Sequence, residues 1–199
     1  MSEKQLLRKL FDKNRDDAHD PRERPVSDEK EPLVVGLQLD LQQIIDVKWK
    51  DYHFAWEPLK YNNVTRLILP HTDVWTPDIL LYNSVDQKID SKLPTNVIAS
   101  YDGNMTWIPP GIYQSSCEIM ISLFPFDTQN CKLKFGIWTY HGQLVDLRFS
   151  DCNTTTCAAA TSEFSTNGEW TLISESPSFH ICQQQTYFNY RIRAGSLGT

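Results

Sequence analysis

The sequence lacks any apolar run of the roughly 18 residues that a membrane-spanning helix requires. The longest candidate, at residues 33–37, is interrupted at once by Gln38. We therefore do not expect this sequence to cross a bilayer.

Motifs of nucleotide, metal and hydrolase sites are also missing. There is no glycine-rich phosphate loop, no Cys-x-x-Cys pair and no Gly-x-Ser-x-Gly segment. The five histidines are scattered, and the spacing pairs none of them with a cysteine or carboxylate as metal ligands. A triad assembled only in space leaves no trace in a sequence, so these absences lower the expectation of an enzyme without ending it. We predict no catalytic residues, no metal ligands and no cofactor.

Positive charge is scarce as well. The formal net charge is −6 and the pI about 5.3, which disfavours nucleic acid or an anionic membrane surface as the main partner. Hydrophobic residues make up 40% and charged residues 22% of the 199 residues, so the chain can bury a core. The length favours a single domain.

Five cysteines occur together with three Asn-x-Ser/Thr sequons. A single sequon is weak evidence because short motifs recur by chance. Three of them beside closely spaced cysteines indicate a secreted or cell-surface protein. We expect glycosylation at Asn63, Asn104 and Asn153.

The N-terminal end has a helical pattern. Leu6, Leu7, Leu10 and Phe11 form one apolar stripe with the 3.6-residue period of a helix. Charges and prolines dominate residues 12–31, which predicts a solvated loop. Residues 194–199 have the composition of an unstructured segment and predict a tail or linker, which leaves residues 1–193 as the domain.

After Pro32 the hydrophobic period changes to two. Val35 and Leu37 alternate with Gly36 and Gln38, as in a half-buried antiparallel strand. About ten short strands, separated by turn signals and accompanied by almost no helix, predict an all-β sandwich. Later strand candidates lie at residues 96–100, 105–108, 118–123, 132–138, 144–149, 169–173 and 186–192.

Cys117 and Cys131 enclose thirteen residues. The pattern favours a strand, a Pro-centred turn and a returning strand tied by a disulfide, and closing such a loop contributes about 3 kcal/mol. The simpler alternative is a structural staple between neighbouring strands. The spacing, with its inner motif, resembles the signature loop of the Cys-loop ligand-gated ion channels, and nicotinic acetylcholine receptor subunits in particular. That motif is Phe124-Pro125-Phe126-Asp127.

The resemblance covers residues 33–193. Other segments match the family in order and approximate spacing. The Trp-Thr-Pro-Asp sequence that begins at Trp75 and continues to Tyr82 and Asn83 is similar to ligand-binding loop A. Residues 134–140 are similar to loop B, residues 108–113 precede the disulfide loop as they do in nicotinic subunits, and residues 168–170 lead toward loop C.

The resemblance implies an immunoglobulin-like β-sandwich with a short N-terminal α-helix, assembled with other receptor subunits as a homo- or hetero-pentamer. It also implies a small cationic neurotransmitter, such as acetylcholine, bound in a box of aromatic rings at the subunit interface. Ring faces attract cations, and those of Trp do so best. The implied ligand-binding residues are Tyr82, Trp138, Thr139, Phe179, Thr106 and Ile108.

These residues divide between two sides of the interface. Tyr82 and Trp138 would be walls on the principal side, and Phe179 is the aromatic candidate of loop C. Thr106 and Ile108 would lie on the complementary side. For a tryptophan outside such a motif core packing is the ordinary interpretation, and we expect it for Trp49, Trp56, Trp75 and Trp170.

In the family the disulfide loop faces the membrane domain, so the motif at residues 124–127 would pass ligand-driven changes to the channel. That membrane domain, a partner in the full-length receptor, is absent from this sequence, so we do not expect the chain alone to gate ions. The implied location is the extracellular face of a postsynaptic plasma membrane, or secretion.

Three segments depart from the family pattern. Loop C has the single Cys182 where α-type subunits have an adjacent pair, which predicts a weaker cation box or a complementary role. Val47 runs straight into Lys48 where the family has a longer stretch that includes the loop D aromatic; a splice form, a deletion and an engineered edit all fit. A two-residue slip of this hairpin would keep the same face buried, and a one-residue slip would invert it.

The third departure lies just after Ser150. Cys152 and Cys157 would pair with each other, or one of them would reach Cys182. Five cysteines leave one over, so a free or intermolecular thiol is expected.

Two other functions fit the same fold. A secreted soluble acetylcholine-binding protein would sequester transmitter, although the paired cysteines of loop C are missing here. A structural or dominant-negative subunit fragment would bind nothing, and the missing loop D segment favours it.

Overall fold

The computed structural model of the chain describes residues 2–14, 18–40, 44–86, 93–122, 127–149, 152–153, 156–157, 170–180 and 185–194. These residues form mostly strands and little helix, so the predicted all-β fold with a short N-terminal helix is confirmed. The helices are α1 (Glu3–Leu10) and the 3-10 helix η1 (Pro58–Tyr61). The strands are β1 (Leu33–Asp40), β2 (Ile44–Ala55), β3 (Arg66–Leu69), β4 (Ile79–Leu81), β5 (Val97–Ser100), β6 (Asp102–Trp107), β7 (Thr128–Ile137), β8 (Val145–Phe149), β9 (Cys152–Asn153), β10 (Thr156–Cys157), β11 (Trp170–His180) and β12 (Gln185–Ala194).

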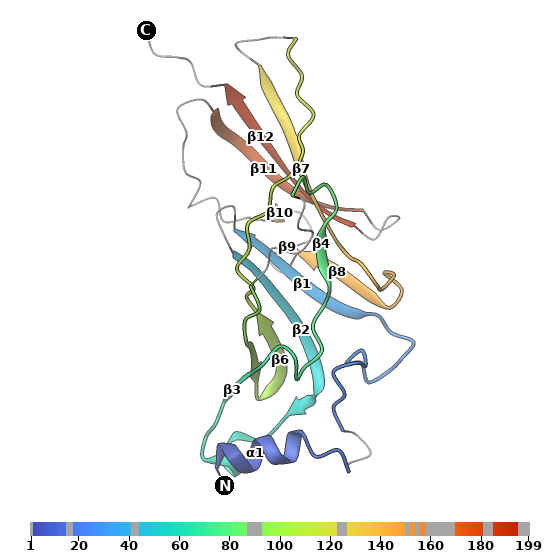
Figure 1. Ribbon diagram of the computed structural model, residues 1–199, viewed down its shortest axis with the longest axis vertical. Coiled ribbons are helices and arrows are strands. Elements are labelled where there is room, and N and C mark those ends of the chain that lie inside the picture. The colour runs from blue at the N-terminus through green and yellow to red at the C-terminus, as the bar shows by residue number, and fades with distance from the viewer. Residues whose placement is uncertain are drawn as a thin grey trace.

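Two large sheets make up the body of the molecule (Figure 1). The six-stranded sheet has the order β3-β5-β6-β2-β1-β8, and the four-stranded sheet has the order β11-β12-β7-β4. Neighbouring strands run antiparallel, apart from the parallel pair β1 and β8. β9 and β10 pair as a separate two-stranded ribbon.

The two large sheets share one core. Val35 and Leu37 of β1 are fully buried, and Phe135 and Ile137 of β7 join them in the same apolar cluster. Because strand side chains alternate between two faces, each strand can bury one row and leave the other in water. Burial between the layers therefore holds the sandwich together.

Most of the described tryptophans belong to this core. Trp49, Trp56 and Trp75 are at most 7% exposed, so the predicted core packing is confirmed for all three. The side chain of Trp170 lies outside the described residues.

The helix α1 lies at one end of the long axis of the molecule (Figure 1). Leu6 and Leu10 are buried in the shared core, and Leu7 and Phe11 pack against it. The apolar stripe predicted for this segment is therefore confirmed. No helix among the described residues combines the length and the apolar composition needed to span a bilayer.

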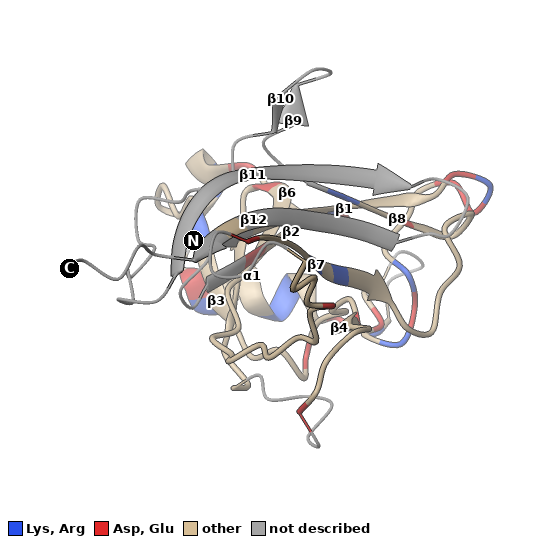
Figure 2. Ribbon diagram, turned by 90° about the horizontal axis from the view of Figure 1, so that it is seen from above, with Lys and Arg blue, Asp and Glu red and all other residues tan. Residues whose placement is uncertain are grey.

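The loop between α1 and β1 is fastened by one arginine. Arg24 Nη1 donates hydrogen bonds to the carbonyls of Glu31 at 2.8 Å and Leu144 at 2.6 Å. Its Nη2 donates to the carbonyl of Glu29 at 2.9 Å. The predicted irregular loop is thus confirmed in its described part, and it is tied to the residue before β8. In the view along the long axis, charges of both signs colour the loops at the edge of the molecule (Figure 2).

The hairpin of β1 and β2 contains the short junction noted in the sequence. β2 runs without interruption through Val47 and Lys48. Leu37 pairs with Val47, and both side chains are buried at 0% and 1% exposure. The register of the hairpin therefore keeps its apolar face inward, while residues 41–43 lie outside the described residues.

One strand prediction is wrong. The apolar stretch at residues 118–123 is not a strand in its described part, 118–122. Ile119 and Ile121 are 53% and 72% exposed. The amide of Gln129 replaces a partner strand, because its Oε1 accepts from the Met120 N–H at 2.8 Å and its Nε2 donates to the Met120 carbonyl at 3.0 Å.

Two other elements differ in extent from the sequence prediction. β4 has only three residues, too few for a periodic signal. β11 continues to His180 rather than ending near residue 173, and it contains Pro177. A proline lacks the N–H of a sheet ladder, and β11 tolerates it because it is an edge strand.

Candidate functional site

An exposed tryptophan stands directly after β7. The Trp138 side chain is 67% exposed, whereas the four other described tryptophans are at most 7% exposed. Its indole lies beside the ring of Tyr82, which follows β4; the ring centroids are 6.1 Å apart and the planes meet at 62°. Such an edge-to-face pair, open to solvent on the indole side, presents an apolar surface with negative ring faces.

Asp78 positions the indole through the backbone. Its carbonyl accepts a hydrogen bond from the Trp138 N–H at 3.1 Å. Its carboxylate Oδ2 accepts from the Thr139 N–H at 2.7 Å. The other carboxylate oxygen, Oδ1, is buried without a hydrogen-bond partner among the described residues. The exposed ring therefore stands on a backbone that is fixed at two consecutive residues.

Tyr82 is held against β7 by its backbone N–H and by the hydroxyl at the tip of its side chain. Its N–H donates to the Lys134 carbonyl at 2.8 Å, and its hydroxyl donates to the Ile137 carbonyl at 2.8 Å. Burial, and secondarily the charge of Asp78, raises the pKa of Tyr82 above its usual 10.0, which keeps the phenol a donor. A Cβ on Gly136 would lie 2.6 Å from Tyr82 Cε2, so the ring needs a glycine beneath it.

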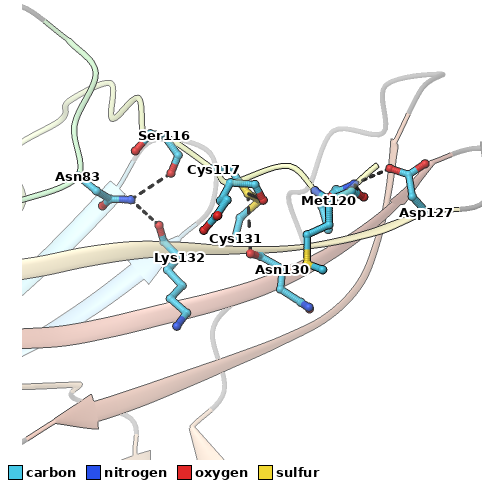
Figure 3. Close-up of a disulfide and its surroundings, with 10 residues drawn as sticks. Asn83, Ser116, Cys117, Met120, Asp127, Asn130, Cys131 and Lys132 are labelled. Atoms are coloured by element: carbon cyan, nitrogen blue, oxygen red, sulfur yellow. Dashed lines mark hydrogen bonds between the residues drawn. A yellow bond between two sulfur atoms is a disulfide. The ribbon is translucent and has the colours of Figure 1, made fainter. Parts of the chain in front are cut away.

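Asn83 connects this ring pair to the disulfide region (Figure 3). Its Nδ2 donates to the Lys132 carbonyl at 2.8 Å and to the Ser116 carbonyl at 3.3 Å. Its Oδ1 accepts from the Lys134 N–H at 3.0 Å. One side chain therefore joins the segment after β4, the strand β7 and the residue before Cys117.

The disulfide joins Cys117 to Cys131, whose Cα atoms are 5.2 Å apart. Cys131 lies in β7, so the bridge fastens the irregular segment after Cys117 to the same strand that ends at Trp138. Asp127 is 4% exposed and accepts a short hydrogen bond from Gln129 Nε2. Residues 124–126 of the predicted coupling motif lie outside the described residues.

Comparison with known proteins identifies a family for this fold and site. The family model described as "Neurotransmitter-gated ion-channel ligand binding domain" matches residues 3–193. The chain belongs to this family. Its members are ligand-binding domains and not enzymes.

Relatives of this ligand-binding domain are acetylcholine receptor subunits. The chain is 41% identical over 184 residues to acetylcholine receptor subunit alpha-type acr-16 of Caenorhabditis briggsae, covering 83% of this chain and 36% of that protein. It is 42% identical over 179 residues to neuronal acetylcholine receptor subunit eat-2 of the same species, covering 82% and 37%. It is 37% identical over 201 residues to an alpha-like subunit of Manduca sexta, covering 87% and 39%. The chain thus spans little more than a third of the length of these curated relatives.

Three other ligand-binding candidates, Thr106, Ile108 and Phe179, are distant from the ring pair in the sequence. Thr106 belongs to β6 of the six-stranded sheet and is half-buried, and Ile108 follows that strand with 37% of its surface exposed. Phe179 pairs with Thr186 in the β11–β12 hairpin, and its side chain lies outside the described residues. The complementary-side candidates therefore lie on or beside the six-stranded sheet, and the principal-side candidates lie on or beside the four-stranded sheet.

The predicted modification sites have different settings in the ligand-binding domain. Asn63 is exposed, with φ of 59°, in the turn after η1, and Asn104 is exposed on β6. Asn153 lies in β9, and its side chain is outside the described residues. Cys152 and Cys157 are opposite each other in the β9–β10 ribbon, which leaves their predicted bridge a prediction, and Cys182 lies outside the described residues.

Sequence spacing indicated no metal ligands, yet the domain brings three candidates together. His19 comes from the loop after α1, and Asp51 and His53 come from β2; one ligand atom from each lies within 4.8 Å of the others. The Asp51-x-His53 spacing was the available signal, and His19 was invisible because it is far away in the sequence.

Proposed function

We propose that this domain binds a small cationic amine, such as acetylcholine, in an aromatic box between neighbouring subunits of a pentameric receptor. Trp138 carries the proposal, because an indole with 67% of its surface in water is unusual in a chain that buries its other described tryptophans. Covering an indole that is two-thirds exposed buries roughly 100–170 Å², which is worth roughly 2.5–4 kcal/mol of apolar transfer free energy. A neighbouring subunit and a ligand together would supply that cover.

The hydrogen bonds that fix Trp138 and Tyr82 support a binding role. The backbone at Trp138 is fixed by Asp78, and Tyr82 is fixed at its N–H and its hydroxyl. The two rings therefore need little ordering when a cation arrives, and preorganisation of this kind reduces the entropic cost of binding. A desolvated cation–π contact contributes about 2 kcal/mol.

The second half of the box would come from the next subunit. Thr106 and Ile108 lie on the six-stranded sheet, and Ile108 offers an exposed apolar side chain. They would form the complementary wall, while Thr139 and Phe179 would complete the principal side. The acetylcholine receptor subunits among the relatives support this assembly.

Binding would be passed on through the disulfide region. A ligand shifts a conformational equilibrium only by its difference in affinity for the two states. Asn83 hydrogen-bonds both to β7 and to Ser116 beside the disulfide, so a shift of the ring pair would reach the segment after Cys117. In a full-length receptor at the extracellular face of the plasma membrane, that segment would act on the membrane domain.

The test is a titration of the chain with acetylcholine, followed by tryptophan fluorescence. We expect Trp138→Ala to weaken binding at least tenfold, about 1.4 kcal/mol, with the fold retained. Ile68→Ala is the matched control, because Ile68 is 68% exposed on β3 of the other sheet. Equal affinity in the wild type and Trp138→Ala would move the site elsewhere.

Light scattering after size exclusion tests the assembly in parallel. A pentamer is expected. A strict monomer that binds no amine would favour the non-binding subunit fragment instead.

A further inference from the structure

Three polar side chains are buried together beside the C-terminal end of α1, where the ring of Phe11 contacts that of His19. The side chains of His19 and Asp51 are each 1% exposed, and that of His53 is 7% exposed. Buried polar groups in folded proteins nearly always have hydrogen-bond partners. Here His19 Nδ1 and Asp51 Oδ2 have none among the described residues.

Asp51 and His53 lie where the regular pairing between β2 and β6 is interrupted. The register of β2 against β6 shifts between Lys50 and Ala55, so Asp51 and His53 lie in a bulge. Gly103 permits the close approach of β6, since its φ is +83° and a Cβ there would lie 2.7 Å from the Asp51 carbonyl oxygen. Bulges of this kind re-aim side chains and are common beside functional sites.

The partner of His19 determines which ring nitrogen carries the proton. Its Nε2 lies 3.1 Å from the Asp73 carbonyl, which can only accept, so Nε2 carries the hydrogen. The neutral form of this ring has no hydrogen at Nδ1. Its Nδ1 is then a lone pair facing the carboxylate, and two acceptors confront each other in a dry interior.

The separation of these two atoms decides what can lie between them. His19 Nδ1 and Asp51 Oδ2 are 3.5 Å apart. A charge-assisted hydrogen bond is shorter, about 2.7–2.9 Å. Two ligands of one tetrahedral ion, each about 2.1 Å from it, are about 3.4 Å apart. The observed spacing therefore matches two ligands of a metal ion better than a shared proton.

His53 supplies the third ligand. Asp51 Oδ1 lies 2.8 Å from His53 Nδ1 and accepts the His53 backbone N–H at 3.0 Å. Because the carboxylate accepts, Nδ1 carries the hydrogen in the metal-free chain. Nδ1 faces the carboxylate and Nε2 points away from it, so an ion shared with Asp51 would bind Nδ1 after that hydrogen moves to Nε2. Hydrogen bonds that fix the tautomer of a ligating histidine are the usual outer support of metal sites, and His19 has one from Nε2 to the Asp73 carbonyl.

We propose that His19, Asp51 and His53 bind one divalent cation of the zinc class, which ties the loop after α1 to strand β2. Two imidazole nitrogens and one carboxylate oxygen suit Zn²⁺, with a water in the fourth position. Phe54 and Phe11 pack beside His19, with ring centroids 4.8 Å and 6.2 Å away, and keep bulk water from the ligands. The site is independent of the amine box, because it uses different elements and a different class of ligand.

The experiment uses the full 199-residue chain, stripped with EDTA and with its thiols outside the disulfide alkylated, so that cysteine cannot bind the metal. Titration with Zn²⁺ by calorimetry is expected to give one equivalent bound and a higher Tm. We expect His19→Asn and His53→Asn each to weaken binding at least tenfold. His141→Asn, at an exposed histidine, is the matched control and should bind as the wild type does.

Co²⁺ provides a readout that does not depend on the variants folding. The unaltered chain should develop the visible absorption of a four-coordinate Co²⁺ ion, and Zn²⁺ should displace it. If the alkylated wild type binds neither ion, or if His141→Asn loses binding while His19→Asn and His53→Asn keep it, the proposal is overturned.

Discussion

The ring pair of Tyr82 and Trp138 and the buried group of His19, Asp51 and His53 depart in opposite directions from the usual distribution of side chains. The first leaves a large apolar side chain in water, and the second leaves buried polar atoms with no hydrogen-bond partner among the residues that the structure describes. Each arrangement costs free energy in the isolated chain. In the two proposals, the counterpart that removes this cost is a neighbouring surface with an amine in the first region and a cation in the second.

The two regions also differ in how they are held. The ring pair depends on backbone hydrogen bonds from Asp78 and on the absence of a side chain at Gly136. The buried group depends on hydrogen bonds made by its own members. Changes in the second region should therefore affect stability, and changes in the first should affect mainly the ligand.

The largest effect on stability is expected from Asp51→Ala. The substitution leaves the backbone N–H and the Nδ1 hydrogen of His53 buried and unpaired. We expect the free energy of unfolding to fall by about 4 kcal/mol, measured by urea denaturation in metal-free buffer. Glu23→Ala removes an exposed carboxylate and should change it by about 0.5 kcal/mol or less. If Asp51→Ala and Glu23→Ala lower the free energy of unfolding by similar amounts, the buried group contributes no more to stability than an exposed carboxylate does.

A smaller loss is expected when both cysteines of the disulfide are replaced by serine. The bridge closes a loop with a sequence separation of 14, and its removal should lower the free energy of unfolding by about 3 kcal/mol. Asn83 links the ring pair to Ser116 beside the bridge, so we expect a loss of amine affinity that is smaller than that of Trp138→Ala. A variant that melts at the wild-type temperature would contradict the stabilising role of the bridge.

Gly136→Ala should have the smallest effect on stability of the three and a direct effect on the ring pair. Its Cβ would lie 2.6 Å from Tyr82, so the ring must move, at a cost of about 2 kcal/mol. We expect a changed near-ultraviolet circular dichroism spectrum and weaker amine binding. Gly111→Ala is the control, because its Cβ would have no neighbour closer than 3.4 Å. An unchanged spectrum in Gly136→Ala would show that Tyr82 is not packed on β7.

Much of the fold was predictable because its patterns are local. The alternation around Val35 and Leu37 in β1 and the stripe of Leu6 and Leu10 in α1 each have a period that a short window reveals. The segment at 118–122 was mistaken for a strand because an apolar run does not reveal whether a partner strand exists. A side chain, that of Gln129, takes the partner's place there.

The candidate site was only partly predictable for a related reason. Tyr82 and Trp138 were found through the family motifs that contain them. The supporting roles of Asp78, Gly136 and Asn83 depend on contacts between distant segments, which spacing does not encode. The loop that carries His19 meets β2 only after the chain has folded, so this group was missed altogether.

The segment after Cys117 is anchored by a covalent bond at one end and by the Gln129 amide three residues later. A strand paired in a sheet cannot change its orientation without breaking a series of backbone hydrogen bonds. The segment after Cys117 is instead attached to β7 at two points, by the disulfide and by the Gln129 side-chain amide. Releasing Met120 exchanges these two hydrogen bonds for bonds to water, and it breaks none of the backbone hydrogen bonds between β7 and its neighbouring strands.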